Sequence, residues 1–517
     1  MIVEFLKLKN FRGYFGTSQI DFENLTAFVG KNDVGKSTIL EALDLFFYEG
    51  TPTGTVKYDA KDINIQAYEQ GERSFSISVG FSDCPEQLVV DSSFETTLAD
   101  EHMLNSDGIL EVCKIFSPDG RPKIVTQIIA NHPANFGCSD LLLKKNSELK
   151  TILGEKDISC KDLRTNALMR RAIWDSFGDS LHYEERPIEV NKEDAKRIYE
   201  KLAKHFPVYA LFQADRKNSD GDSEVQDPLK FAVKQILEEK NLQDLLRSVT
   251  EQVSMQLKDV ANRTLEKLKE MNPGVAESLN PDIPDIDKLK WADVFKSVSI
   301  AGDNSIPINK RGSGTRRLIL LNFFRAEAER LASKEVSEDG SDVGVVYAIE
   351  EPETSQHTAN QRILIQAFKK MAKNPRPQII LTTHSPVVVK ELELKNIRIV
   401  REESAPHVEA VRDGLLGTSS MSEINYLSYG DGSEEYHDEL YALLETNKIL
   451  KDFEAEQDKI CYQRLRKDGN VTPEELSLST YIRHQIHHPE NKLNKSYTDQ
   501  QLIESINKMR EFLKKEN

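Results

Sequence analysis

A nine-residue segment near the start of this 517-residue chain restricts its fold more than any other feature. Residues 30–38 read GKNDVGKST and fit the pattern G-x-x-x-x-G-K-[ST]. The apolar run Leu25 to Val29 predicts a short strand before this segment, and Ser37 to Phe47 have the periodicity of a helix. A glycine-rich loop between a strand and a helix is the context that a phosphate-binding loop requires. The segment therefore predicts an α/β fold with a P-loop.

The residue types in this loop predict how it binds a nucleotide. Glycines allow backbone N–H groups to close on phosphate oxygens, and the following helix N-terminus adds positive potential. Lys36 is expected to bridge the β- and γ-phosphates, and Ser37 to ligate Mg²⁺. The positions expected to contact the nucleotide are Gly30, Asn32, Gly35, Lys36, Ser37 and Thr38.

A second predicted strand ends in a group of acids. Val343 to Ile349 is an apolar run, and Glu350, Glu351, Pro352 and Glu353 follow it. A buried strand that delivers paired acids at its C-terminal end is a Walker B arrangement. Glu350 is expected in the Mg²⁺ shell, and Glu351 is expected to orient and polarise the attacking water. The role of Glu353 stays open between a surface residue and an acid at a helix N-terminus.

Two further segments fit a nucleotide site. Ile379 to Thr383 predict another strand, and the His384 that follows can hydrogen-bond the γ-phosphate. Gly312, Ser313 and Gly314 precede an apolar-striped helix, where the helix N-terminus favours an anion. A second phosphate-binding segment in one chain suggests that it contacts a nucleotide held by a second chain. A simple helix-capping turn is the alternative.

These elements in this order resemble the ABC-type ATPase head, the group that includes the SMC, RecF and overcoming-lysogenization-defect (OLD) proteins. The resemblance covers about 1–135 and 205–430, and the segments LKLKNFRGY, IEEPE and TTHSP look like the OLD-like and RecF-like branch. It implies that the nucleotide is ATP and that two heads enclose two ATP molecules. It also implies that Asn10, Phe11 and Arg12 lie near the nucleotide. Gln213 and Gln66 are both candidates for the Q-loop glutamine that the family carries.

The whole chain is expected to be an α/β protein, an ABC-type P-loop ATPase head with an antiparallel β layer, helical insertions and a C-terminal helical region. Alternating residues at 74–83, 110–117 and 123–130 predict the antiparallel layer. The expected parts are a first ATPase lobe at 1–135, a mainly helical insertion at 136–310 with a return strand near 206–213 and a helix at 228–271, a second ATPase lobe at 311–430, and a C-terminal helical docking or oligomerisation region at 431–517.

Composition narrows the class of protein. The chain has 68 basic and 85 acidic residues, a net charge of −17, which argues against extensive coating of nucleic acid but leaves a local basic groove possible. The sequence has no apolar run of about 18 residues, so no membrane span is expected. Five scattered cysteines fit a reducing cytoplasm.

The sequence shows no clear pattern for the nuclease module of OLD proteins or for the coiled-coil arms of SMC proteins. A Toprim nuclease needs a Glu and then Asp-x-Asp, and no convincing version follows His384. Asp220-Gly221-Asp222 has the spacing but lies in a polar segment that we interpret as a solvated loop. SMC-type arms need hundreds of heptad residues, and 228–271 is too short. We therefore expect an ATPase without an obvious nuclease of its own.

The C-terminal segment carries Arg483, His484, His487 and His488 within six residues. His484 and His488 share a helical face, which permits a metal site. Arg483 and His488 also fit the loose Arg-x4-6-His pattern of HEPN ribonucleases, in which the His is an acid/base and the Arg stabilises phosphate. The interpretation that we favour is that these four residues lie at a helix end packed in a docking or oligomerisation region.

This ending and the segment from Glu423 to Tyr441 resemble stand-alone ATPases of bacterial antiphage operons, above all PtuA of the Septu systems, with the PARIS ATPase as a near relative. The resemblance implies a cytoplasmic homo-oligomer that senses or regulates and works with a separate HNH-type nuclease. A DNA-repair clamp that binds nucleic acid, and a C-terminal HEPN-like ribonuclease, are the alternatives.

Overall fold

The computed structural model describes most of the chain on either side of one long central segment. The described residues are 1–213 and 344–516, without 32, 52, 87, 92–93, 355, 375, 403–404, 412–413, 417–419 and 467–468, together with 237, 242–248 and 255. Most of the expected helix at 228–271 lies outside the described residues, as do Asn32, Gly312, Ser313 and Gly314. In the described part of the chain, no helix has the length and hydropathy that a bilayer span requires.

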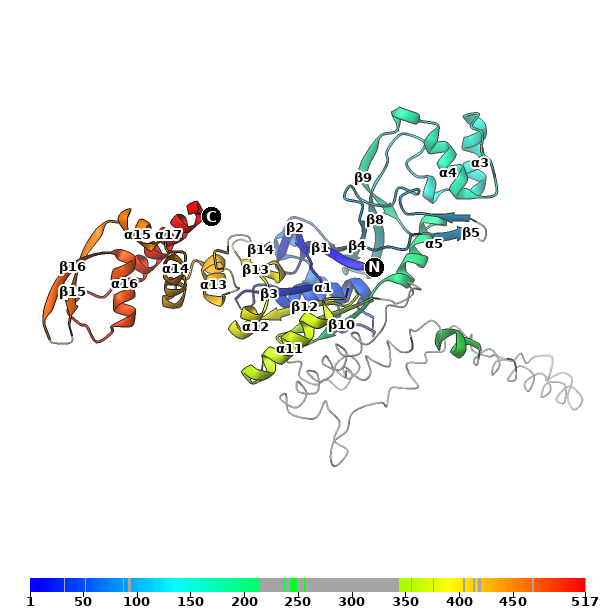
Figure 1. The fold of residues 1–517 in the computed structure, drawn as a ribbon. Coiled ribbons are helices and arrows are strands. Elements are labelled where there is room, and N and C mark those ends of the chain that lie inside the picture. Colours follow the sequence, from blue (N-terminus) through cyan, green and yellow to red (C-terminus); the bar gives the residue numbers. More distant parts are fainter. Residues whose placement is uncertain are drawn as a thin grey trace, which may run out of the picture.

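A mostly parallel sheet forms one layer of the molecule (Figure 1). Its strand order is β10-β11-β12-β3-β13-β14, and only the pair β13–β14 is antiparallel. The parallel strands read as continuous apolar runs because both faces of this sheet are covered by other parts of the chain. The strands are β3 (Leu25–Val29), β10 (Val208–Phe212), β11 (Val345–Glu350), β12 (Gln378–Thr383), β13 (Ile397–Glu402) and β14 (Pro406–Ala410). On one face pack α11 (Thr358–Met371) and α12 (Pro386–Glu391).

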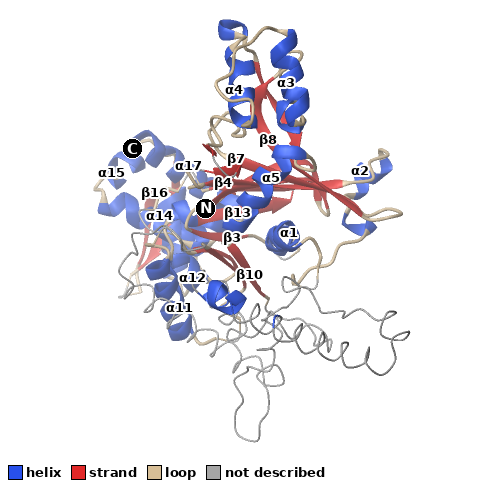
Figure 2. Cartoon of the chain, turned by 90° about the vertical axis from the view of Figure 1, so that its right-hand side faces the viewer, coloured by secondary structure: helices blue, strands red, loops and turns tan. Residues whose placement is uncertain are grey.

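An antiparallel sheet of order β2-β1-β4-β7-β8-β9 forms the second layer. Helix α1 (Lys36–Tyr48) lies between the two sheets (Figure 2), and its apolar residues join both inner faces in one core. The antiparallel layer was expected, and its strands are β1 (Ile2–Phe11), β2 (Tyr14–Asp21), β4 (Phe75–Ser82), β7 (Leu110–Ser117), β8 (Lys123–Pro133) and β9 (Tyr183–Glu189). Beside it lie α2 (Ile65–Glu69) and the small pair β5 (Leu88–Asp91) and β6 (Phe94–Thr96).

The first lobe does not end at the expected position 135. Strand β9 pairs with β8 and extends the antiparallel sheet into the segment that was expected to be mainly helical. This edge strand reads YEERPIE and buries only Ile188 among its seven residues. An edge strand so rich in charge has no alternating apolar pattern, which is why the sequence did not indicate it.

A small helical unit lies at the end of β8 and β9 (Figure 1), and Figure 2 shows it projecting from the sheet. It contains α3 (Asn146–Glu155) and α4 (Asn166–Asp175), and α5 (Glu193–Leu202) follows β9. The unit has its own apolar core, formed by Cys138, Leu141, Leu149, Leu153, Met169, Ile173 and Trp174. Because this core is separate from the core between the two sheets, the helical unit is an insertion outside the sheet core.

The C-terminal unit lies on the opposite side of the sheets from α3 and α4 (Figure 1). The expected helical region also contains a β-hairpin, β15 (Lys459–Leu465) with β16 (Val471–Ser477). Its helices are α13 (Met421–Tyr429), α14 (Glu434–Thr446), α15 (Leu450–Ala455), α16 (Leu478–His487) and α17 (Asp499–Glu516). Leu415, Leu416 and Tyr426 pack on the core of this unit, so it begins before the expected boundary at 431.

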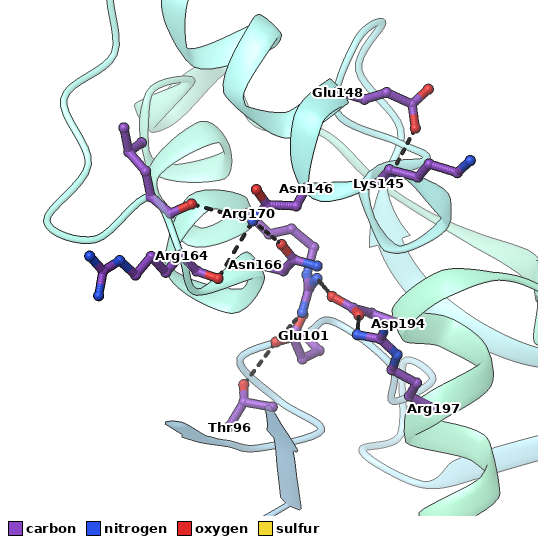
Figure 3. A network of polar contacts seen from close by, with 11 residues as sticks. Thr96, Glu101, Lys145, Asn146, Glu148, Arg164, Asn166, Arg170, Asp194 and Arg197 are labelled. Carbon is purple, nitrogen blue, oxygen red and sulfur yellow. Dashed lines mark hydrogen bonds and ion pairs between the residues drawn. The ribbon is translucent and has the colours of Figure 1, made fainter. Parts of the chain in front are cut away.

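A buried ion network holds the helical unit to the rest of the chain (Figure 3). Arg170 of α4 is fully buried and donates from Nε and Nη2 to the two carboxylate oxygens of Glu101, at 2.7 and 2.9 Å. Its Nη1 pairs with Asp194 of α5. Thr96 donates to Glu101, and Arg197 donates to Asp194. Every charge in the network therefore has a partner, as buried charges require.

Arg170→Ala is expected to lower the free energy of unfolding by about 3–5 kcal/mol, because Glu101 would stay buried without its counter-charge and Asp194 would keep only Arg197. The neighbouring Arg171→Ala is the matched control, since Arg171 forms an exposed surface pair worth less than about 1 kcal/mol. Urea unfolding monitored by tryptophan fluorescence measures both variants, because Trp174 lies in the same unit. Equal losses in the two variants would contradict the role of the network.

Candidate functional site

The P-loop follows β3 and runs directly into α1. Two of its residues have a left-handed backbone, Asp33 with φ of 63° and Gly35 with φ of 97°. A Cβ at position 35 would lie 3.2 Å from the ring of Tyr14, so both backbone conformation and space favour glycine there. The Tyr14 hydroxyl donates to the Gly35 carbonyl oxygen at 3.2 Å. Tyr14, the first residue of β2, thus packs against the P-loop and supports its backbone.

Lys36 is the buried cation of this loop. Its Nζ donates to the main-chain carbonyl oxygens of Gly30, at 3.0 Å, and of Lys31. Burial lowers the pKa of Lys36 to about 8, although Glu351 and other nearby acids oppose the shift. An ammonium bonds a phosphate oxygen more strongly than a neutral carbonyl oxygen. The loop therefore presents a cation that suits an anionic ligand.

Ser37 and Glu350 meet although they lie 313 positions apart in the sequence. Ser37 is in the first turn of α1, and its Oγ donates to Oε1 of Glu350, the last residue of β11. A hydroxyl and a carboxylate are the hard oxygen ligands that Mg²⁺ prefers. The donor set that the sequence predicted for a metal is thus brought together, and its chemistry fits Mg²⁺.

The structure separates the two candidate Q-loop glutamines. Phe212 of β10 lies opposite Ile349 of β11, so the next residue, Gln213, is level with Glu350 at the same sheet edge. Gln213 donates through Nε2 to Glu41 at 3.1 Å, and its Oε1 is buried without a hydrogen-bond partner among the described residues. Gln66 lies on α2, outside this sheet edge. The geometry therefore favours Gln213.

Glu351 and His384 lie next to each other at the ends of β11 and β12. The distance from His384 Nε2 to Glu351 Oε1 is 3.4 Å. Glu351 has φ of 40°, and its main-chain N–H donates to both the carbonyl and the hydroxyl oxygen of Thr382 at 3.1 Å. Burial and nearby Lys36 lower the pKa of His384, which favours the neutral imidazole. A carboxylate and a neutral imidazole therefore face the same point beside the P-loop.

Glu353 fits neither of its two expected roles. It is buried, and α11 begins only at Thr358, so it is neither a surface residue nor an acid in the first turn of that helix. Its Oε1 accepts from the Thr383 hydroxyl at 2.7 Å and from the His384 main-chain N–H at 2.8 Å. Burial raises the pKa of Glu353. No periodic pattern indicates that Glu353 accepts from the His384 main chain, because Glu353 lies in a loop.

Arg12 contacts the helix that follows the P-loop. It has φ of 49°, donates from Nε to Asp62 at 2.7 Å, and pairs through Nη1 with Glu41 of α1. Asn10, two residues before Arg12, accepts from the main-chain N–H of Gly16 at 3.0 Å. Arg12 is therefore held by two carboxylates, and one of them, Glu41, lies one helical turn after Ser37.

The four C-terminal residues singled out in the sequence have separate partners. Arg483 pairs with Glu445 and lies over the Tyr441 ring, His484 bonds Arg464, His487 pairs with Asp438, and His488 pairs with Glu490. The described residues contain no group of three or more His, Cys, Asp or Glu side chains suited to a metal ion. The structure therefore does not bring Arg483 and His488 onto a common partner.

The chain is similar to two bacterial proteins over most of its length. It is 24% identical over 415 residues to an OLD nuclease of Thermus scotoductus, which covers 77% of this chain and 62% of that protein. It is 22% identical over 424 residues to the "Retron Ec83 probable ATPase" of Escherichia coli, which covers 77% of this chain and 71% of that protein. The chain thus spans less than two thirds of the length of the OLD nuclease.

The chain is also similar to solved SMC head structures and matches a family model. The SMC head bound to the C-winged helix domain of ScpA is 16% identical, with a TM-score of 0.35 over 82% of this chain and 100% of that one. The SMC head domain of Thermotoga maritima is 12% identical, with a TM-score of 0.32 over 80% of this chain and 100% of that one. The model of the AAA ATPase domain matches residues 1–389. Because this match covers most of the chain, the protein belongs to the AAA ATPase domain family.

Proposed function

We propose that this chain binds and hydrolyses ATP with Mg²⁺, and that the reaction regulates a bacterial antiphage defence complex. The contact between Ser37 and Glu350 carries the first part, because it joins the P-loop helix to the strand that ends beside Glu351. The relatives named OLD nuclease and retron probable ATPase support the second part.

Each residue of the site has a distinct task in this reaction. Lys36 binds the phosphates, and Ser37 and Glu350 hold Mg²⁺, with Gln213 as a further oxygen donor. Bound Mg²⁺ supplies Lewis-acid stabilisation of the phosphate charge. Glu351 orients the attacking water and accepts its proton. His384 hydrogen-bonds the γ-phosphate, since a neutral imidazole can donate as well as accept.

We propose further that the active form is a homo-oligomer in the cytoplasm. Gly312, Ser313 and Gly314 of a second copy would complete the ATP site, as in the ATP-sandwich heads that the motifs resemble. The finer assignment is a PtuA-like subunit that controls a separate HNH-type nuclease. Slow hydrolysis suits this role, because a regulatory state must persist while ATP is bound.

The C-terminal unit is the proposed contact for the nuclease. Leu465 and Val471 lie directly opposite each other in the β15–β16 hairpin, and both side chains are exposed. Exposed apolar neighbours at the end of a protruding unit are typical of protein interaction sites. This hairpin is also the part of the unit that lies farthest from the ATPase sheets (Figure 1).

Glu351→Gln is expected to slow ATP hydrolysis by about 10²- to 10⁴-fold, because the general base is lost. ATP binding should remain, so the variant should retain labelled ATP after gel filtration. The exposed Glu393→Gln is the control and should hydrolyse ATP at the wild-type rate. Wild-type hydrolysis in Glu351→Gln would exclude this residue as the catalytic base.

Glu353→Leu is expected to lower kcat by about 10- to 100-fold with little change in ATP affinity, because His384 loses the acceptor that fixes its main chain. Glu353→Gln should keep most of the activity, since an amide oxygen can accept the same two bonds. Steady-state kinetics of both variants measure the separation of kcat from KM. A loss of ATP affinity that matches the loss of kcat would contradict a role in placing His384.

Leu465→Glu combined with Val471→Glu is expected to abolish partner binding and to leave ATP binding unchanged. Affinity purification of the full chain from its bacterial host, followed by native mass analysis with and without ATP, measures the assembly. Ile363→Glu on α11 is the control, because this exposed apolar residue lies on the ATPase part. A partner that survives the double substitution would refute the docking role, and a dimer that carries DNA instead of a nuclease would favour a repair clamp.

A further inference from the structure

Glu41 joins parts of the site that no sequence motif connects. It lies four residues after Ser37 on α1, so both side chains project from the same helical face. Ser37 bonds Glu350 after β11, and Glu41 accepts from Gln213 after the neighbouring strand β10. Two polar contacts one helical turn apart therefore connect α1 to the ends of two adjacent parallel strands.

The carboxylate of Glu41 determines which way the Gln213 amide faces. An ionised carboxylate only accepts hydrogen bonds, so the NH₂ group of Gln213 turns toward it. The amide oxygen then faces the other way, and this Oε1 is buried without a hydrogen-bond partner among the described residues. An amide oxygen is a suitable ligand for Mg²⁺, whereas an NH₂ group is not.

Arg12 pairs with Glu41 and balances its charge. Its guanidinium has only donors, and it pairs with Glu41 on one side and Asp62 on the other. The distance between α1 and β10 does not depend on Glu41 alone, because the Tyr209 hydroxyl donates to the Leu40 carbonyl oxygen at 2.6 Å. A change at Glu41 should therefore alter the amide orientation more than the helix position.

We propose that Glu41 is a positioning residue that holds the Gln213 amide with its oxygen toward the Mg²⁺ of the ATP site. The inference rests on the proposed function, since it concerns the same site and the same metal. Outer residues that orient a metal ligand commonly change metal affinity by about 10- to 100-fold when they are removed.

The test measures ATP binding to the full-length chain by calorimetry, first in EDTA and then over a series of Mg²⁺ concentrations. Glu41→Ala is expected to raise the half-saturating Mg²⁺ concentration about tenfold, while ATP affinity in EDTA stays at the wild-type value. Gln213→Ala should give the same increase. The double variant should show no larger increase than either single variant, because both substitutions act on the same Mg²⁺ ligand, the Gln213 amide oxygen. Asp62→Asn is the control, since it removes the other partner of Arg12 without touching Gln213.

The outcomes separate this inference from the proposed function. If the ATP affinity of the wild-type chain does not depend on Mg²⁺ concentration, both the proposed Mg²⁺ site and the role of Glu41 are wrong. A Mg²⁺-dependent wild type with no shift in Glu41→Ala, or additive shifts in the double variant, would overturn the role of Glu41 alone. If Glu41→Ala does not fold, Glu41→Gln is measured instead. A smaller shift in the same direction is expected for Glu41→Gln, and no shift would overturn the inference.

Discussion

The position of α1 between the two sheets is the constraint on which the site depends. Its apolar side packs into the shared core, and its N-terminal turn carries Lys36 and Ser37. The strand order β11-β12-β3 then brings Glu350 within hydrogen-bonding distance of Ser37. One helix thus fixes the P-loop, the acidic strand end and, through Glu41, the residue after β10. A displacement of this helix would separate all three at once.

The P-loop, the paired acids and His384 could be predicted because each has a local signal. A buried strand appears in the sequence as an apolar run. The polar residue that follows it lies at the C-terminal edge of the sheet, which is where parallel sheets of this kind bind ligands. Gln213 could be named only as one of two glutamines, because its place depends on the pairing of β10 with β11. That pairing joins segments far apart in the sequence, and no local pattern reports it.

The residues that sequence reasoning missed act through tertiary contacts. Glu353 looks like any acid in a polar loop until β12 places the His384 main chain beside it. Arg170 belongs to a charged helix segment, yet Glu101 and Asp194 converge on it from elements that are remote in sequence. The hairpin β15–β16 was not predicted because its strands are polar and mostly exposed, so they lack an alternating apolar pattern. The same reason applies to β9.

Helix α13 determines how the C-terminal unit is attached to the nucleotide site. Ile424 belongs to the apolar core beneath the parallel sheet, whereas Tyr426 packs on the core of the C-terminal unit. The same helix contacts α12, and the N-cap residue of α12, Ser385, directly follows His384. Within the C-terminal unit, Arg510 of α17 reaches the buried Glu423 of α13. The unit is therefore joined through a helix whose buried Glu423 and Ile424 contact the two neighbouring parts, so a shift at the His384 end of α12 acts on packed side chains and not on a free linker.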